Sequence, residues 1–134
     1  MKFIYATLII MEISSIIKNI TPKKHARHWS ELMEQNKNNL KFLPNEAQWF
    51  INNLLYLFYF IQIALVIISI PTFMRAGLIF IPALVLCDGL YCIFRYAIIC
   101  GGDIIRSCAN PPGYIMGMID CLVWLLWGIC GIVL

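Results

Sequence analysis

Three charged residues lie at membrane depth in the stretch 88–120, and their types and spacing could do chemistry: Asp88, Arg95 and Asp120. Asp88 and Arg95 are seven positions apart, which puts them on nearly the same face of a helix, about 10 Å apart along its axis. If the next apolar segment runs back antiparallel, Asp120 lies at a depth close to that of Arg95. We therefore predict an Arg95–Asp120 ion pair, with Asp88 on the same stripe but less well matched.

Two hypotheses follow for these intramembrane charges. Each charge costs about 2.5–3.5 kcal/mol at the centre of a membrane helix, so all three should face protein or water rather than lipid. They could form a proton or ion pathway in which Asp88 titrates, or a buried polar lock between helices or subunits. We favour the lock, because a balanced acid–base pair holds helices together without moving anything. No second basic residue and no intramembrane histidine completes a relay.

The composition indicates that the elements carrying these charges are membrane helices. Of the 134 residues, 61% are hydrophobic and 13% are charged. The mean hydropathy is +0.80, far above that of a soluble domain. The length allows one domain, residues 1–134, with three or four membrane helices. We predict an all-α integral membrane protein with no separate soluble catalytic domain.

Helix start and stop signals divide the chain into five predicted elements. These are an N-terminal apolar helix over 3–20, a polar surface segment over 21–45, and transmembrane helices over 46–70, 73–100 and 111–134.

Three pairs of residues mark predicted helix starts. The Thr-Pro pair at 21–22 and the Asn-Pro pair at 110–111 each supply an N-cap followed by proline at the first helical position. Asn45 with Gln48 has the spacing of a capping box. The first of these starts opens an amphipathic surface helix of about 14 residues, whose short apolar stripe would lie against the membrane or a partner.

Proline and glycine mark the predicted stops and one bend. Pro71 should end the first span, because it lacks the N–H that a helix interior needs. Pro82 lies in the first half of the second span and should kink it. The two glycines at 101–102 should stop that span.

The apolar segment 3–20 has two interpretations. It could span the bilayer as a short, tilted helix, or it could lie in the interface with Thr7 and Lys18 on its polar face. We favour a fourth span, because that polar face is too weak for a good interfacial helix. Lys2 before an apolar run is also the layout of a signal peptide, but Glu12 interrupts the run, so we expect no cleaved leader.

The polar segment carries most of the charge. Residues 18–47 hold six basic and three acidic side chains, so this loop should face the cytosol or the mitochondrial matrix. Lys23, Lys24 and Arg27 could contact anionic lipids such as cardiolipin, or form a solvated basic face. His25 and His28 alone underfill a zinc shell, so we expect both to be solvated or to face headgroups. We predict no metal site and no nucleic-acid surface.

The last span carries a stripe of small residues that predicts helix packing. Six residues at spacings of three and four share one helical face: Gly113, Gly117, Asp120, Trp124, Gly128 and Gly131. Small residues let another helix approach closely, so this stripe should be a helix–helix interface. The opposite side, rich in leucine and isoleucine, suits lipid.

The six cysteines do not form a recognisable site. No two are spaced as C-x-x-C, which removes the sequence support for zinc knuckles, redox pairs and haem attachment. Most lie in or beside apolar helices, where cysteine behaves as a small hydrophobic residue.

No catalytic motif appears, so we expect neither an enzyme nor a cofactor site. We predict a non-catalytic accessory subunit that binds other membrane subunits of a larger complex and supports its assembly and stability. A respiratory or ATP synthase complex of the mitochondrial inner membrane is the preferred location, with the 18–47 loop in the matrix. The alternative is a small oligomeric channel or transporter that uses the intramembrane acids to pass protons or ions.

Overall fold

The computed structural model describes every residue from 1 to 134 and contains helices and no strands. The elements in chain order are α1 (Lys2–Lys18), α2 (Pro22–Leu40), α3 (Asn45–Arg75), α4 (Phe80–Phe94), the π-helical turn η1 (Arg95–Ile99), α5 (Ile104–Ala109) and α6 (Tyr114–Val133).

Three helices are long and apolar enough to cross a membrane: α3, α4 continued by η1, and α6. The all-helical class and the three apolar spans expected from the sequence are confirmed. The chain bends by 110° between α1 and α2, and this pair passes the same test only when the two helices are taken together. Whether segment 3–20 spans a membrane therefore stays a prediction.

The expected helix end at Pro71 is wrong, and Pro82 lies at a helix start rather than inside a span. α3 continues through Pro71 to Arg75, and the turn to α4 comes at Gly77, which has a positive φ of 73°. A proline costs an interior helix one hydrogen bond, which the packed helix tolerates. Pro82 lies in the first turn of α4, where an N–H has no intrahelical partner to lose. No kink is therefore needed there.

Helix starts agree with the sequence at two of the three predicted places, since α2 begins at Pro22 and α3 at Asn45. The Thr21 side chain caps α2 by accepting from the Lys24 N–H at 3.1 Å, and α2 is longer than expected at 19 residues. Gln48 does not close a capping box, because its amide donates to the Leu40 and Leu43 carbonyls. Residues 110–113 are not helical, so α6 begins at Tyr114, three residues later than expected.

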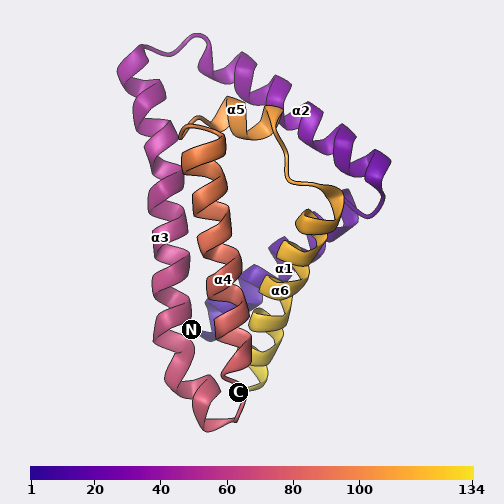
Figure 1. Cartoon of the computed structure of the whole chain (residues 1–134), viewed down its shortest axis with the longest axis vertical. Coiled ribbons are helices and arrows are strands. Elements are labelled where there is room, and N and C mark those ends of the chain that lie inside the picture. The colour runs from indigo at the N-terminus through magenta and orange to yellow at the C-terminus, as the bar shows by residue number, and fades with distance from the viewer.

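The turn after η1 contains a short helix that the sequence did not predict. Gly101 and Gly102 have positive φ angles of 62° and 72° and reverse the chain. The Asp103 carboxylate then caps α5 by accepting from the Ile105 N–H at 2.8 Å. α5 packs against α2, so these two helices form a layer across one end of the molecule (Figure 1).

The three apolar spans and α1 lie on one side of that layer (Figure 1). α3 and α4 form an antiparallel hairpin, α4 packs against α6, and α1 lies along α6 (Figure 1). Tyr5 meets Gly131 and Ile9 meets Gly128, so α1 and α6 are antiparallel. The Lys2 ammonium donates to the Gly131 carbonyl at 2.9 Å and so places a positive charge at the C-terminus of α6.

The core lies where α1, α3, α4 and α6 meet. Its buried residues are Tyr5, Val66, Phe73, Ile81, Val85, Trp124 and Trp127. Trp127 is 1% exposed, and its indole donates to the Ser69 hydroxyl at 3.0 Å. This bond satisfies a polar group that would otherwise be buried without a partner.

Candidate functional site

The central polar contact of the molecule lies between α4 and α6. Asp88 and Cys92 are one turn apart on α4, and Asp120 and Trp124 are one turn apart on α6. The Trp124 indole donates to Asp88 Oδ2 at 3.0 Å. The Cys92 thiol donates to Asp120 Oδ1 at 3.5 Å. These two contacts define the antiparallel register of the helices.

The two acids and the cysteine form a compact cluster. One ligand atom from each of Asp88, Cys92 and Asp120 lies within 4.8 Å of the others, and all three residues are half-buried. Two ionised carboxylates this close repel each other, so the pair favours a shared proton or a bound cation. The cluster offers three of the four ligands of a structural zinc site and no histidine. Proton or cation binding is the chemistry that it fits best.

The predicted Arg95–Asp120 ion pair is wrong. Arg95 is buried, and its guanidinium donates to the Asn110 carbonyl at 2.6 Å and to the Ser107 hydroxyl at 3.2 Å. It also contacts the Cys100 sulfur at 3.7 Å. Arg95 therefore holds α5 and the following turn in place, rather than neutralising an acid on α6.

Helix register explains this difference. Cys92, not Arg95, lies opposite Asp120 where α4 and α6 pack together. Arg95 is three residues further along the chain, so its long side chain reaches the uncharged acceptors of α5. Arg95 still lines a small cavity of about 100 Å³ with Asp88 and Asp120, so the three charges are neighbours without an ion pair between them.

A third carboxylate, Glu12 of α1, joins the same region. It lines a cavity of about 190 Å³ together with Cys92 and Asp120. The chain has one ion pair, between Arg27 and Glu31 on the surface of α2. None of the three carboxylates among the apolar helices is therefore paired with a basic side chain.

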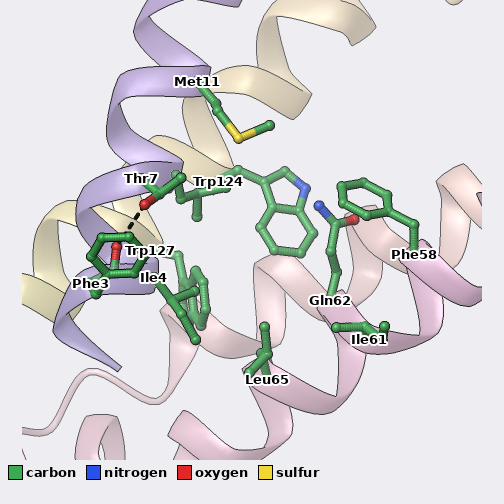
Figure 2. Close-up of a pocket in the computed structure, with 11 residues that line it drawn as sticks. Phe3, Ile4, Thr7, Met11, Phe58, Ile61, Gln62, Leu65, Trp124 and Trp127 are labelled. Carbon is green, nitrogen blue, oxygen red and sulfur yellow. Dashed lines mark hydrogen bonds between the residues drawn. The ribbon is translucent and has the colours of Figure 1, made fainter.

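An apolar cavity of about 230 Å³ adjoins the carboxylate cavity. It lies between α1, α3 and α6, and Figure 2 shows their side chains converging on it. Its lining residues are Phe3, Ile4, Thr7, Leu8, Met11, Phe58, Ile61, Gln62, Leu65, Trp124 and Trp127. Gln62 points toward the Trp124 indole (Figure 2). It is the one amide in an otherwise largely apolar wall.

The small-residue stripe of α6 contacts several different neighbours. Gly128 and Gly131 allow α1 to approach, since a Cβ at Gly128 would lie 3.1 Å from Ile9 and one at Gly131 would run into the Tyr5 ring. Gly117 faces the His25 ring, whereas nothing lies within 4 Å of a Cβ at Gly113. Within the chain, α1 thus occupies part of the face that the sequence predicted to bind a helix.

His25 is not solvated, contrary to expectation. It is 6% exposed, with Nδ1 at 3.1 Å from Asn19 Oδ1 and Nε2 at 2.9 Å from the Pro112 carbonyl. The 110° bend before α2 brings its first turn against the start of α6, and the imidazole joins the two. A lone histidine in a polar run carries no sequence signal for such a contact.

The basic residues of α1 and α2 line a surface hollow of about 250 Å³. Of the three residues predicted to contact anionic lipid, Lys24 and Arg27 line this hollow and Lys23 does not. Lys18 and His28 line it as well. Partial burial lowers the pKa of His28, Lys18 lowers it further, and Glu31 opposes both effects. Three basic side chains and one acid, Glu31, line the hollow, and this excess of positive charge suits it to an anion.

Glu12, Cys92 and Trp124 lie in the polar centre around Asp88 and Asp120. The sequence did not identify Glu12 or Cys92 as functional residues, and it predicted only a packing role for Trp124. Glu12 is the one charge inside the first apolar run, and Cys92 lies one turn after Asp88, so both had a detectable signal. The sequence puts Trp124 on the packing stripe but does not match its indole donor with an acid. That match depends on helix register, which spacing within one helix does not determine.

Comparison of the chain with protein families, with curated proteins and with solved structures finds no match.

Proposed function

We propose that the protein is a multi-pass membrane protein in which the carboxylates of Asp88 and Asp120 bind protons or cations and let them pass. Asp88 and Asp120 approach each other on neighbouring apolar helices, without an ion pair to any basic residue. This arrangement carries the proposal, since an unneutralised acid pair among apolar helices needs a proton or a cation.

Membrane insertion is part of this proposal. The three apolar helices leave most of their surface uncovered, and only 11% of the most apolar window of α3 is buried. Lipid tails would cover that surface at little cost. α1 would then be a fourth span, because it lies along α6 and its Glu12 is level with the carboxylate pair.

Flux through liposomes tests the proposed function. The purified chain is reconstituted with an entrapped pH-sensitive dye, and a membrane potential is imposed; sodium and potassium uptake are measured in parallel. Asp88→Asn and Asp120→Asn should each reduce the flux at least tenfold, because each removes a carboxylate from the pair.

Glu34→Gln is the matched control, since Glu34 is an exposed acid on α2 outside every cavity described here. Its flux should equal that of the unaltered chain. Equal flux in all four proteins, or flux no greater than in empty liposomes, would contradict the proposal.

An accessory subunit of a larger membrane complex is the second candidate, and the uncovered face of α3 favours it. Exposed large side chains follow this helix from one end to the other, among them Trp49, Leu57, Phe60 and Ile68. Such a face fits other membrane subunits as well as lipid. A mitochondrial inner-membrane respiratory or ATP synthase complex, with segment 18–47 in the matrix, is the location proposed from the charge of that segment.

Site-specific crosslinking separates the two candidates. A photoreactive phenylalanine analogue replaces Phe60, which is 58% exposed, or Tyr96, which is fully buried. In native membranes an accessory subunit should give discrete crosslinks to other chains from position 60 and none from position 96. Crosslinks to lipid alone from position 60 would remove the support for this candidate.

A further inference from the structure

The apolar cavity adjoins the carboxylate cavity, and together they make up a hollow with a shared wall. Both are lined by Leu8, Met11, Phe58, Gln62 and Trp124. Their volumes of about 230 and 190 Å³, taken together, exceed the lower limit of small-molecule sites, which is about 300 Å³. One end of the hollow is apolar and the other is acidic.

The acidic end lacks a counter-charge from the chain. Glu12 and Asp120 both line it, and neither forms an ion pair. Arg95, the nearest basic residue in the adjoining cavity, is directed to the Asn110 carbonyl and the Ser107 hydroxyl. A cation entering the hollow would therefore meet two carboxylates, and an anion would be repelled.

The boundary between the two ends also suits a cationic group. The Gln62 side chain makes no hydrogen bond within the chain, so its amide oxygen can accept one from a ligand. The rings of Phe58 and Trp124 lie at the same boundary (Figure 2). Aromatic faces attract cations, most strongly where water is excluded.

We propose that this hollow binds a lipophilic cation: an alkyl or aryl body between α1, α3 and α6, with its ammonium group at Glu12 and Asp120. The inference rests on the proposed cation-binding function and names the class of cation. Phe3 and Ile61, at the apolar end, are themselves exposed on the surface that lipid would cover. An amine dissolved in the bilayer would therefore enter with its apolar body in contact with this wall.

Matched neutral and charged probes test the inference. Two of the four tryptophans, Trp29 and Trp49, are replaced by phenylalanine, so that indole fluorescence reports only Trp124 and Trp127. The chain in phosphatidylcholine nanodiscs is titrated with 4-phenylbutylamine and with the neutral isostere 4-phenylbutanol. The amine should give a saturable change with a Kd at least tenfold below that of the alcohol.

Variants then test which end of the site binds the ammonium group and which end binds the apolar body. Glu12→Gln and, independently, Asp120→Asn should weaken the amine at least tenfold and leave the alcohol unchanged, whereas Glu34→Gln should change neither. Ile61→Phe narrows the apolar end alone and should weaken both probes to the same extent. Circular dichroism and thermal unfolding establish that each variant is folded.

Failure of this inference is distinguishable from failure of the proposed function. Equal binding of amine and alcohol in every variant would identify an acyl-chain slot and overturn the inference. A fluorescence change caused only by sodium or by protons, with no saturable amine response, would overturn it as well. In either case the liposome flux of the Asp88→Asn variant still decides the proposed function by itself.

Discussion

Trp124 contacts both the polar cluster around Asp88 and the apolar core around Trp127. Its indole N–H donates to Asp88, its ring packs edge-on against Trp127 with centroids 5.8 Å apart, and it lines both adjoining cavities. A tryptophan suits this place, because it is large and apolar but carries one hydrogen-bond donor. Phenylalanine would keep the packing and lose the donor.

Trp124→Phe should therefore destabilise the protein by about 1–3 kcal/mol, because the half-buried Asp88 loses its partner. In a double-mutant cycle with Asp88→Asn, thermal or denaturant unfolding in mild detergent should give a coupling energy of about 1 kcal/mol. Trp49→Phe, on an exposed tryptophan, should be additive with Asp88→Asn. Additivity in both cycles would show that the indole–carboxylate bond adds nothing to stability.

Anion binding in the basic hollow at the start of α2 should depend on pH. Burial and Lys18 lower the pKa of His28, so an anion bound in the hollow should raise that pKa by favouring the charged imidazole. Binding of anionic lipid is then linked to proton uptake, so affinity should increase as the pH falls through the range in which His28 titrates.

Histidine NMR titrations in nanodiscs measure this shift. The pKa of His28 should be higher with phosphatidylglycerol present than in phosphatidylcholine alone. Lys24→Ala should reduce the difference, and Lys23→Ala should not, because only Lys24 lines the hollow. The same His28 pKa in both lipids would argue for a solvated basic face instead.

At the scale of the elements, the least expected feature is the close packing of α1 along α6. The small residues of α6 were predicted to meet a helix, but spacing within one helix does not say which one. The structure places α1 there, since Gly128 and Gly131 leave room for Tyr5 and Ile9. The Tyr5 ring then packs edge-on against Trp127 at 4.8 Å between centroids and joins the core.

Gly131→Ser should destabilise this helix pair by about 1–3 kcal/mol, because its Cβ would force the buried Tyr5 ring to move. Gly113→Ser is the matched control: no atom lies within 4 Å of a Cβ there, and serine is a favoured N-cap at the position that caps α6. Unfolding midpoints in the same detergent at the same scan rate compare the two. A greater loss at position 113 would contradict the packing described here.

At the scale of the whole molecule, α2 and α5 form a polar layer at one end of the apolar helices (Figure 1). The turn between α3 and α4 lies at the other end. If α3 crosses the membrane, its two ends face different compartments. Most of the excess basic charge lies before α3, so the end with the α2 layer should face the cytosol or matrix.

Labelling with a membrane-impermeant maleimide tests this orientation. Glu34→Cys on α2 and Arg75→Cys at the far end of α3 should react from opposite sides of a sealed membrane. The unaltered chain, which already has six cysteines, gives the background to subtract. Labelling of both positions from the same side would show that α3 does not span.

The sequence by itself determined the elements that depend on local chemistry. Hydropathy predicted the three apolar helices, and the Thr21 cap predicted the start of α2, because both signals lie within a few neighbouring residues. Tertiary structure decided everything that depends on register between helices. The packing of α4 against α6 places Cys92 opposite Asp120, while Arg95 contacts Ser107 and Asn110 and the acids have no basic partner. Lateral register is set by packing along the full length of two helices, so spacing along one chain segment does not contain it.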